Sequence, residues 1–313
     1  MLEQQEHGQT SHRMQWILAA LITVLLLIGC CFASRMQPAN EQDLMAQTRL
    51  MEVQGEPCEA EVAMLDPEAE LVILGDSIMA KEREYRTMAS YLMEATGLKV
   101  YNAAFGGSCA QKTNREDRSS YHEDSLNLYA LQEAICSNDY GVQLADLPNN
   151  AYQTGYFART ILGLSRLDFT KVRYLIIEHG TNDCIAGLPL SDPGDPYSVL
   201  TFEGAMRLSI EHLQQTYPGM QIILVSPTYC KLTDTKEPFT ETDFGYGTVE
   251  DFYALEQRLA AEYDLPLIDV LHGAGINEEN VKELTEDGLH LNAEGRDLYG
   301  TYLGAEVAKL ITK

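Results

Sequence analysis

Short apolar runs alternate with longer amphipathic segments along the chain from residue 70 onward. The apolar runs are rich in Ile, Leu and Val and lack clean polar alternation, which is typical of strands covered on both faces. Five runs predict strands, at 71–74, 99–103, 173–178, 221–225 and 266–270. Six amphipathic segments predict helices, at 84–95, 126–136, 152–164, 202–217, 249–263 and 293–311. This alternation predicts a parallel sheet wrapped by helices, with Asn292 as the N-cap of the last helix.

The N-terminal part of the chain carries a different pattern, a long apolar run. Residues 16–34 contain no charge and are flanked by Arg13 and Arg35, which suits a transmembrane helix. The tetrapeptide ending at Cys30, Leu-Ile-Gly-Cys, instead resembles a bacterial lipobox, so that a signal is cleaved and Cys30 lipidated. A buried core helix is the third interpretation. The first two both predict a membrane-anchored protein, single-pass or lipoprotein, whose remaining chain is extracytoplasmic.

The remaining sequence divides into a tail, a stalk and one domain. Residues 1–15 form the short tail, and residues 35–69 are acidic and interrupted by prolines, as expected of a stalk or linker. The 313-residue length leaves room for one sizeable α/β domain, at 70–313. A βα unit needs about 30 residues, so the long separation between the second and third strands predicts a helical insertion at 108–167.

Charge limits the partners that this chain can take. There are 22 Lys and Arg against 47 Asp and Glu, a formal net charge of −25. The first 35 residues hold two charges of each sign, so the rest of the chain carries the excess. Such a surface repels phosphate backbones and anionic lipid headgroups. Nucleic acid is therefore not expected as a partner, and a neutral or glycosidic substrate is accommodated more readily than a polyanion.

Three polar residues near predicted element ends form a candidate catalytic triad. Ser77 follows the first strand after a Gly-Asp turn, and a serine at the carboxyl end of a parallel strand faces the ligand crevice. Asp287 and His290 lie three residues apart before the last helix, so the carboxylate can hold the imidazole while its other nitrogen faces the serine. Either segment alone has an ordinary alternative, a helix cap or a solvated loop. The other histidines are not expected to be catalytic.

Ester hydrolysis by such a triad also needs hydrogen-bond donors that stabilise the oxyanion. Gly107 lies in a Gly-Gly turn after the second strand, and Asn182 follows the third. The N–H groups of Ser77 and Gly107 and the Asn182 amide predict a three-donor oxyanion hole. Asp76 and Asp183 are assigned to turn stabilisation. Substrate choice is expected to lie in the insertion and in the loops after the third and fourth strands.

The seven cysteines are scattered, with neither a CxxC pair nor a His-flanked cluster. No zinc site is therefore expected. Cys109 and Cys184 each lie two residues after a predicted oxyanion residue, so convergence of the two loops would make their sulfurs neighbours. Packing as small apolar residues is favoured over a disulfide between them.

The candidate residues occur in the order of the four blocks that define the SGNH (GDSL) hydrolase superfamily: Ser77, Gly107, Asn182 and His290. The chain resembles this family over 71–311, and Asp287 matches its triad acid. The resemblance implies a three-layer α/β/α sandwich with a five-stranded, flavodoxin-like parallel sheet, hydrolysis of acyl esters, and no metal or other cofactor. The chain departs from the family at Ile78-Met79, where Thr often occurs, and in the insertion. It also lacks the G-x-S-x-G elbow of α/β-hydrolases.

These observations predict a serine esterase that hydrolyses acyl esters, with O-acetyl groups on extracellular or cell-wall carbohydrate as the favoured substrate. The alternatives are an O-acyltransferase on cell-surface polymers, a lipase, lysophospholipase or thioesterase with the same triad, and an inactive binding protein. Trp16, the only tryptophan, lies in the apolar run, so sugar stacking would depend on some of the 17 tyrosines. The sequence predicts no oligomeric state.

Overall fold

The computed structural model describes residues 68–113, 123–150, 156–232, 235 and 237–311. The tail, the apolar run and nearly all of the stalk lie outside these residues, as does the alternative of a lipidated Cys30. Within the described part of the chain, no helix is both long and apolar enough to cross a membrane.

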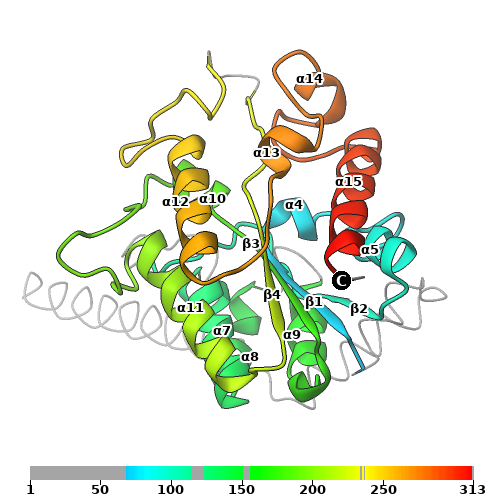
Figure 1. The fold of residues 1–313 in the computed structure, drawn as a ribbon, viewed down its shortest axis with the longest axis vertical. Coiled ribbons are helices and arrows are strands. Elements are labelled where there is room, and N and C mark those ends of the chain that lie inside the picture. The colour runs from blue at the N-terminus through cyan, green and yellow to red at the C-terminus, as the bar shows by residue number, and fades with distance from the viewer. Residues whose placement is uncertain (1–67, 114–122, 151–155, 233–234, 236, 312–313) are drawn as a thin grey trace, which may run out of the picture. The chain divides into compact units, whose positions relative to one another are not determined.

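Five parallel strands form one sheet, in the order β2-β1-β3-β4-β5 (Figure 1). Their bounds are β1 Leu71–Gly75, β2 Val100–Asn102, β3 Tyr174–Glu178, β4 Gln221–Val225 and β5 Leu267–Ile268. All five predicted strands are present, and two of the three interior strands, β1 and β3, are buried at every position. The order reverses direction between β1 and β3, and ligands of such sheets bind at that switch point, outside the carboxyl ends of the strands.

Helices cover both faces of the sheet, so the predicted α/β/α sandwich is confirmed (Figure 1). One layer holds α5 (Met88–Thr96) and α15 (Ala293–Ile311). On the other face lie α7 (Leu128–Ser137), α8 (Gly141–Asn150), α9 (Phe157–Leu164), α11 (Phe202–Thr216) and α12 (Val249–Glu262). The remaining short helices are α4 (Ser77–Ala80), α6 (Glu123–Leu126), η1 (Phe169–Lys171), α10 (Thr181–Ile185), α13 (Val270–Gly273) and α14 (Val281–Leu284).

Helix ends follow their caps, which explains the differences from the predicted bounds. Helix α5 begins at Met88 rather than at 84, because the Thr87 side chain accepts the N–H of Ser90 and caps it there. Residues 84–87 therefore belong to the loop between α4 and α5, which we call the loop behind Ser77. Helix α15 has its predicted bounds, and its predicted cap is confirmed, since Gly295 N donates to Asn292 Oδ1 at 3.0 Å.

Close packing of α15 on α5 brings two distant parts of the chain to the same edge of the sheet. Gly300 on α15 permits this approach, because a Cβ there would lie 2.3 Å from the ring of Tyr91 on α5. Arg296, in the first turns of α15, pairs with Glu82 in the loop behind Ser77 at 3.3 Å. The loop that precedes α15 is therefore held beside the segment that carries Ser77.

Candidate active site

Ser77, at the start of α4, meets Asp287 and His290, from the loop between α14 and α15, at the carboxyl edge of the sheet. His290 Nε2 lies 3.0 Å from Ser77 Oγ, and His290 Nδ1 lies 2.6 Å from Asp287 Oδ2. Asp287 Oδ1 also accepts the backbone N–H groups of Leu289 and His290, at 3.0 and 2.7 Å. Burial raises the pKa of Asp287, but hydrogen bonds from the His290 side chain and backbone outweigh it and lower that pKa to about 2. Asp287 is thus a carboxylate that accepts from the imidazole.

The turn that presents Ser77 has little free space. Asp76 caps α4 by accepting the N–H of Ile78 at 2.8 Å, and Glu178 Oε2 accepts the N–H of Asp76 at 3.2 Å. A Cβ on Gly75 would lie 3.0 Å from both Glu178 Oε2 and Met79 Cγ. Glycine at this position therefore lets the strand turn directly into the helix that starts at Ser77.

The loop that carries Asp287 and His290 is docked on the loop after β4. Lys231 N donates to Gly288 O at 2.8 Å. Gly288 has a φ of +91°, a backbone conformation that residues with side chains rarely adopt. A Cβ there would also lie 2.0 Å from Lys231 O, so a side chain has no room. An ion pair between Lys81 and Glu286 joins the same loop to the segment behind Ser77. These contacts fix the imidazole against the serine.

The two predicted oxyanion residues lie in loops that converge. Gly107 has a φ of +75° in the turn after β2, and Asn182 is the second residue of α10 after β3. The Asn182 amide Nδ2 donates to Ser108 O at 3.0 Å and to Asp76 Oδ2 at 3.2 Å. Both neighbours are acceptors, so both N–H groups of the amide already have partners. To donate to an oxyanion, the amide must share one of these two N–H groups with it or break one of the two hydrogen bonds.

Asp183, which the sequence assigns to turn stabilisation, stabilises a loop other than its own and so joins the two loops. Its buried carboxylate accepts the N–H of Ala110 at 2.9 and 3.0 Å and that of Gln111 at 3.2 Å. The loops converge as the cysteine argument supposed. Cys109 and Cys184 are both buried, and no disulfide joins them.

The expectation that only His290 has a carboxylate at this spacing before a helix is wrong, because Asp269 and His272 repeat the Asp-x-x-His spacing at the start of α13. His272 Nδ1 lies 3.1 Å from Asp269 Oδ1, so the same ring nitrogen faces the aspartate as in the first pair, at a longer distance. Its Nε2 lies 3.1 Å from Glu250 Oε1, so the second nitrogen meets another carboxylate instead of a serine. The contacts of Nε2 are what distinguish the two pairs. His179, beside the third motif, is fully buried, and burial lowers its pKa to about 3, which keeps it neutral.

Four carboxyl groups are buried beneath the site: Asp76, Glu178, Asp183 and Glu256. Burial is the largest cause of their shifts, raising the pKa of Asp76 to about 7 and that of Asp183 to about 6. It raises the pKa of Glu178 and Glu256 well above the usual range. Neither Glu256 oxygen has a hydrogen-bond partner among the described residues. Burial therefore shifts all four groups toward the protonated form.

Glu256→Gln is expected to stabilise the protein at pH 8 and to change it little at pH 5. Folding raises the pKa of Glu256 from its ordinary value of 4.5. The free energy of unfolding is therefore highest below pH 4.5, and it falls as the pH rises toward the pKa of the folded state. The melting temperature at pH 8 should rise by about 2 °C or more, the shift that about 1 kcal/mol produces in a domain of this size. Glu279→Gln, which removes an exposed charge, is the control, and an equal shift in both variants would contradict this account.

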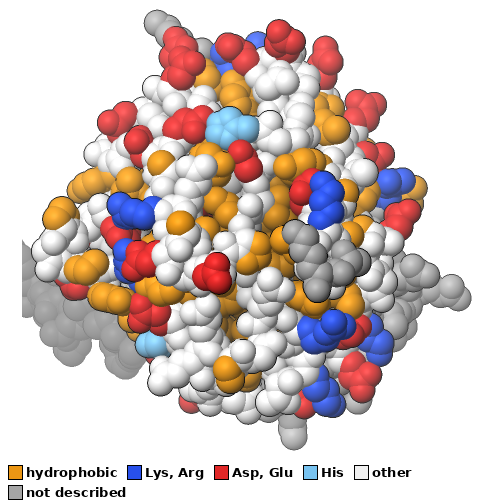
Figure 2. Space-filling view, in the orientation of Figure 1, with side chains coloured by type: hydrophobic (Ala, Val, Ile, Leu, Met, Phe, Trp, Pro, Cys, Tyr) orange, Lys and Arg blue, Asp and Glu red, His pale blue; other side chains and the backbone are white. Residues whose placement is uncertain are grey.

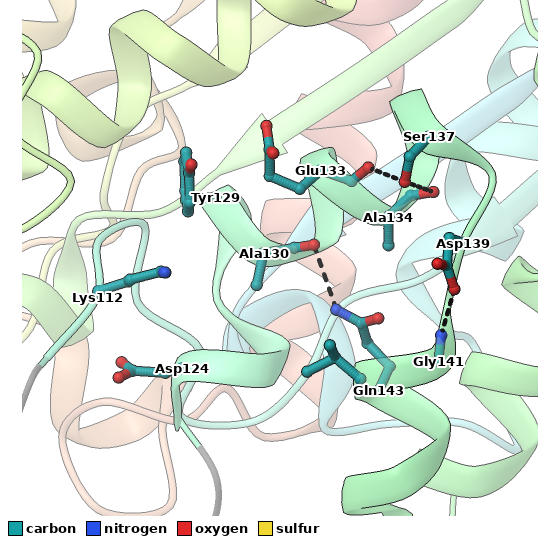
Figure 3. A pocket seen from close by; sticks show the side chains of 11 residues that line it. Lys112, Asp124, Tyr129, Ala130, Glu133, Ala134, Ser137, Asp139, Gly141 and Gln143 are labelled. Carbon is teal, nitrogen blue, oxygen red and sulfur yellow. Dashed lines mark hydrogen bonds between the residues drawn. The ribbon is translucent and has the colours of Figure 1, made fainter.

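Other features of the described residues lie outside this constellation. No group of three or more His, Cys, Asp or Glu in the described ranges could hold a metal ion. A surface depression of about 530 Å³ lies over the insertion and is lined by residues that include Lys112, Tyr129 and Glu133 (Figure 3). It contains none of the triad or oxyanion candidates.

The fold and the family match together define a hydrolase of ester bonds. Residues 73–298 match the profile of the GDSL-like Lipase/Acylhydrolase family, and the chain belongs to this family. A solved structure of a protein from Lactobacillus plantarum is 18% identical and has a TM-score of 0.51, with 77% of this chain and 97% of that chain covered. A possible lipase from Chitinophaga pinensis DSM 2588 is 17% identical, with a TM-score of 0.50 and coverage of 79% and 100%. At such identities the two structures show a shared fold. Curated proteins give no match.

Proposed function

We propose that this hydrolase is a serine esterase in which Ser77, His290 and Asp287 act as the catalytic triad. The observation that carries the proposal is the continuous hydrogen-bonded line from Asp287 through His290 to Ser77. Asp287 keeps the proton on Nδ1, so that Nε2 is free to take the proton of Ser77 Oγ as this oxygen attacks the ester carbonyl. The tetrahedral oxyanion is stabilised by the N–H groups of Ser77 and Gly107 and by the Asn182 amide.

The second half of the reaction uses the same groups in reverse. His290 gives its proton to the leaving alcohol, which departs and leaves an acyl ester on Ser77 Oγ. His290 then takes a proton from a water molecule that attacks this ester. The acid is released, and the proton returns to Ser77.

We propose O-acetyl groups on extracellular or cell-wall carbohydrate as the substrate. The acidic surface supports this choice, because Asp and Glu side chains spread over the visible face disfavour a polyanion (Figure 2). Two exposed aromatic side chains also support it, since one lies between α4 and α5 and the other in the loop after β4. Tyr85 follows Ser77 and is 74% exposed, and Tyr246 lies in the loop after β4 and is 55% exposed. Both are available to pack against sugar rings.

The test is a substrate panel on the full chain in detergent, with Ser77→Ala as the control. Aryl acetate and acetylated glycans should be hydrolysed with release of free acetate, and long-chain aryl esters much more slowly. Preference for the long chain would favour the lipase alternative. Acetyl transfer to an added sugar without free acetate would favour the transferase. Equal rates in wild type and Ser77→Ala would sink the esterase proposal.

We further propose that the apolar run at 16–34 anchors the protein with its domain outside the cytoplasm. Support comes from its length and its flanking arginines. The mass of the protein recovered from membranes separates an intact single-pass chain from one cleaved before Cys30.

A further inference from the structure

Tyr156 brings the insertion into contact with the turn that holds Gly107. This residue immediately precedes α9, and its Oη accepts the N–H of Gly106 at 2.8 Å. A Cβ placed on Gly106 would lie 3.4 Å from Tyr156 Oη and 3.9 Å from Ser77 Cβ. Gly106 thus lies close to both the Tyr156 hydroxyl and Ser77, although no motif in the sequence marks Tyr156.

The turn that Tyr156 contacts needs an external support. Ser108 N donates to Phe105 O at 3.1 Å, which closes a β-turn with Gly106 and Gly107 at its centre. The peptide between two central residues can flip between turn types, and a flip reverses the N–H of the second one. Two glycines give this peptide the least resistance to flipping. Since Gly107 N–H is the proposed oxyanion donor, its direction has to be fixed by contacts on either side of the peptide.

Arg83 fixes the ring of Tyr156 in turn. Its guanidinium carbon lies 4.2 Å from the ring centroid, a cation–π geometry. The same group donates to the carbonyls of Ala80 at 2.7 Å and Asn102 at 2.9 Å, and also to that of Ala104. One side chain therefore joins the end of the Ser77 helix, the end of β2 and the insertion.

Aromatic neighbours leave the Tyr156 ring little freedom. Its centroid lies 5.0 Å from that of Phe157, edge to face, and 6.4 Å from that of Phe105, nearly parallel. Phe105 itself is fully buried and is the first residue of the turn. The hydroxyl direction is thereby set by packing and not by the hydrogen bond alone.

We propose that Tyr156 is a positioning residue of the oxyanion hole, held by Arg83. By accepting the N–H of Gly106 it immobilises one side of the Gly106–Gly107 turn, so that Gly107 N–H stays directed at the carbonyl oxygen of the substrate. The inference rests on the proposed esterase function and deepens it. Through Tyr156, the insertion would then help to orient an oxyanion donor, in addition to its expected role in substrate choice.

Tyr156→Phe tests this in the full chain, because it removes the acceptor and keeps the ring and its stacking. We expect kcat on an aryl acetate to fall about 10-fold, as a donor displaced by a fraction of an ångström loses part of its effect. KM and the melting temperature should stay close to wild type. Inactivation by an aryl phosphonate, which builds the same oxyanion on Ser77, should slow by the same factor.

Tyr217→Phe is the matched control, since the Tyr217 hydroxyl also bonds backbone, donating to Ile135 O at 2.8 Å. Tyr217 is the C-cap of α11 and precedes β4, so it lies at the amino-terminal edge of the sheet, opposite the site. That variant should keep wild-type kcat. Wild-type kcat in Tyr156→Phe, or a loss that Tyr217→Phe shares, would overturn the positioning role while leaving the esterase intact. Activity that survives Ser77→Ala would overturn both proposals.

Discussion

His290→Ala should lower kcat/KM for an aryl acetate by on the order of 10⁵-fold, close to the loss in Ser77→Ala, and the double variant should lose little more. The physical reason is that the two side chains act as one unit: the imidazole is held 3.0 Å from Ser77 Oγ, and this oxygen bonds no other base in the described part of the chain. Initial rates measured for both single variants and the double variant at equal folded concentration check the expectation.

The chain supplies its own control for this experiment. His272 has the same Asp-x-x-His spacing, but its two ring nitrogens contact Asp269 and Glu250 instead of a serine. His272→Ala should therefore leave kcat/KM within about 3-fold of wild type, in line with the small effect of a surface ion pair. Substantial activity in His290→Ala would mean that Asp287 and His290 form a capped loop without a catalytic role.

Asn182→Ala should lower kcat by about 10²- to 10³-fold with little change in KM, the loss that follows removal of one oxyanion donor. The effect is confined to kcat because the amide interacts more strongly with the charged oxygen of the transition state than with the ester carbonyl. In the structure the amide donates to Asp76 and Ser108, so the variant also removes two contacts between loops. Melting temperature and kcat must therefore be measured together.

Asn280→Ala is the matched control for these lost contacts. Its amide likewise donates to a backbone carbonyl, that of Gly275 at 2.8 Å, and its Oδ1 accepts from Asn277. We expect it to change kcat less than 2-fold. A lower melting temperature with unchanged kcat in Asn182→Ala would instead assign Asn182 to joining the loops.

The sheet could be predicted from the sequence because strands covered on both faces must be apolar throughout. Leu71–Gly75 and Tyr174–Glu178 are buried at every position, and this leaves continuous runs that local inspection detects. The last helix was predictable for a related reason, since a capping side chain, Asn292, stands at its start. Helix starts governed by a less obvious cap, such as Thr87, were predicted too early.

The candidate site was predictable as a set of positions, because the carboxyl ends of parallel strands lie at one edge and each candidate followed a strand or preceded α15. The prediction did not extend to interactions. Asp183 bonds backbone more than 70 residues away, and both N–H groups of Asn182 already have acceptors. Neither result follows from a turn motif, since the partners belong to other loops.

By itself the sequence determined the α/β class, the strands and the residue types needed for ester hydrolysis, because burial pattern and strand ends are local properties. Only the tertiary structure decided which of two Asp-x-x-His pairs meets a serine, that Asp183 joins two loops, and that Arg83 and Tyr156 support the glycine turn. Those contacts join residues far apart in the chain, and their geometry depends on how α5, α15 and the insertion pack around the sheet.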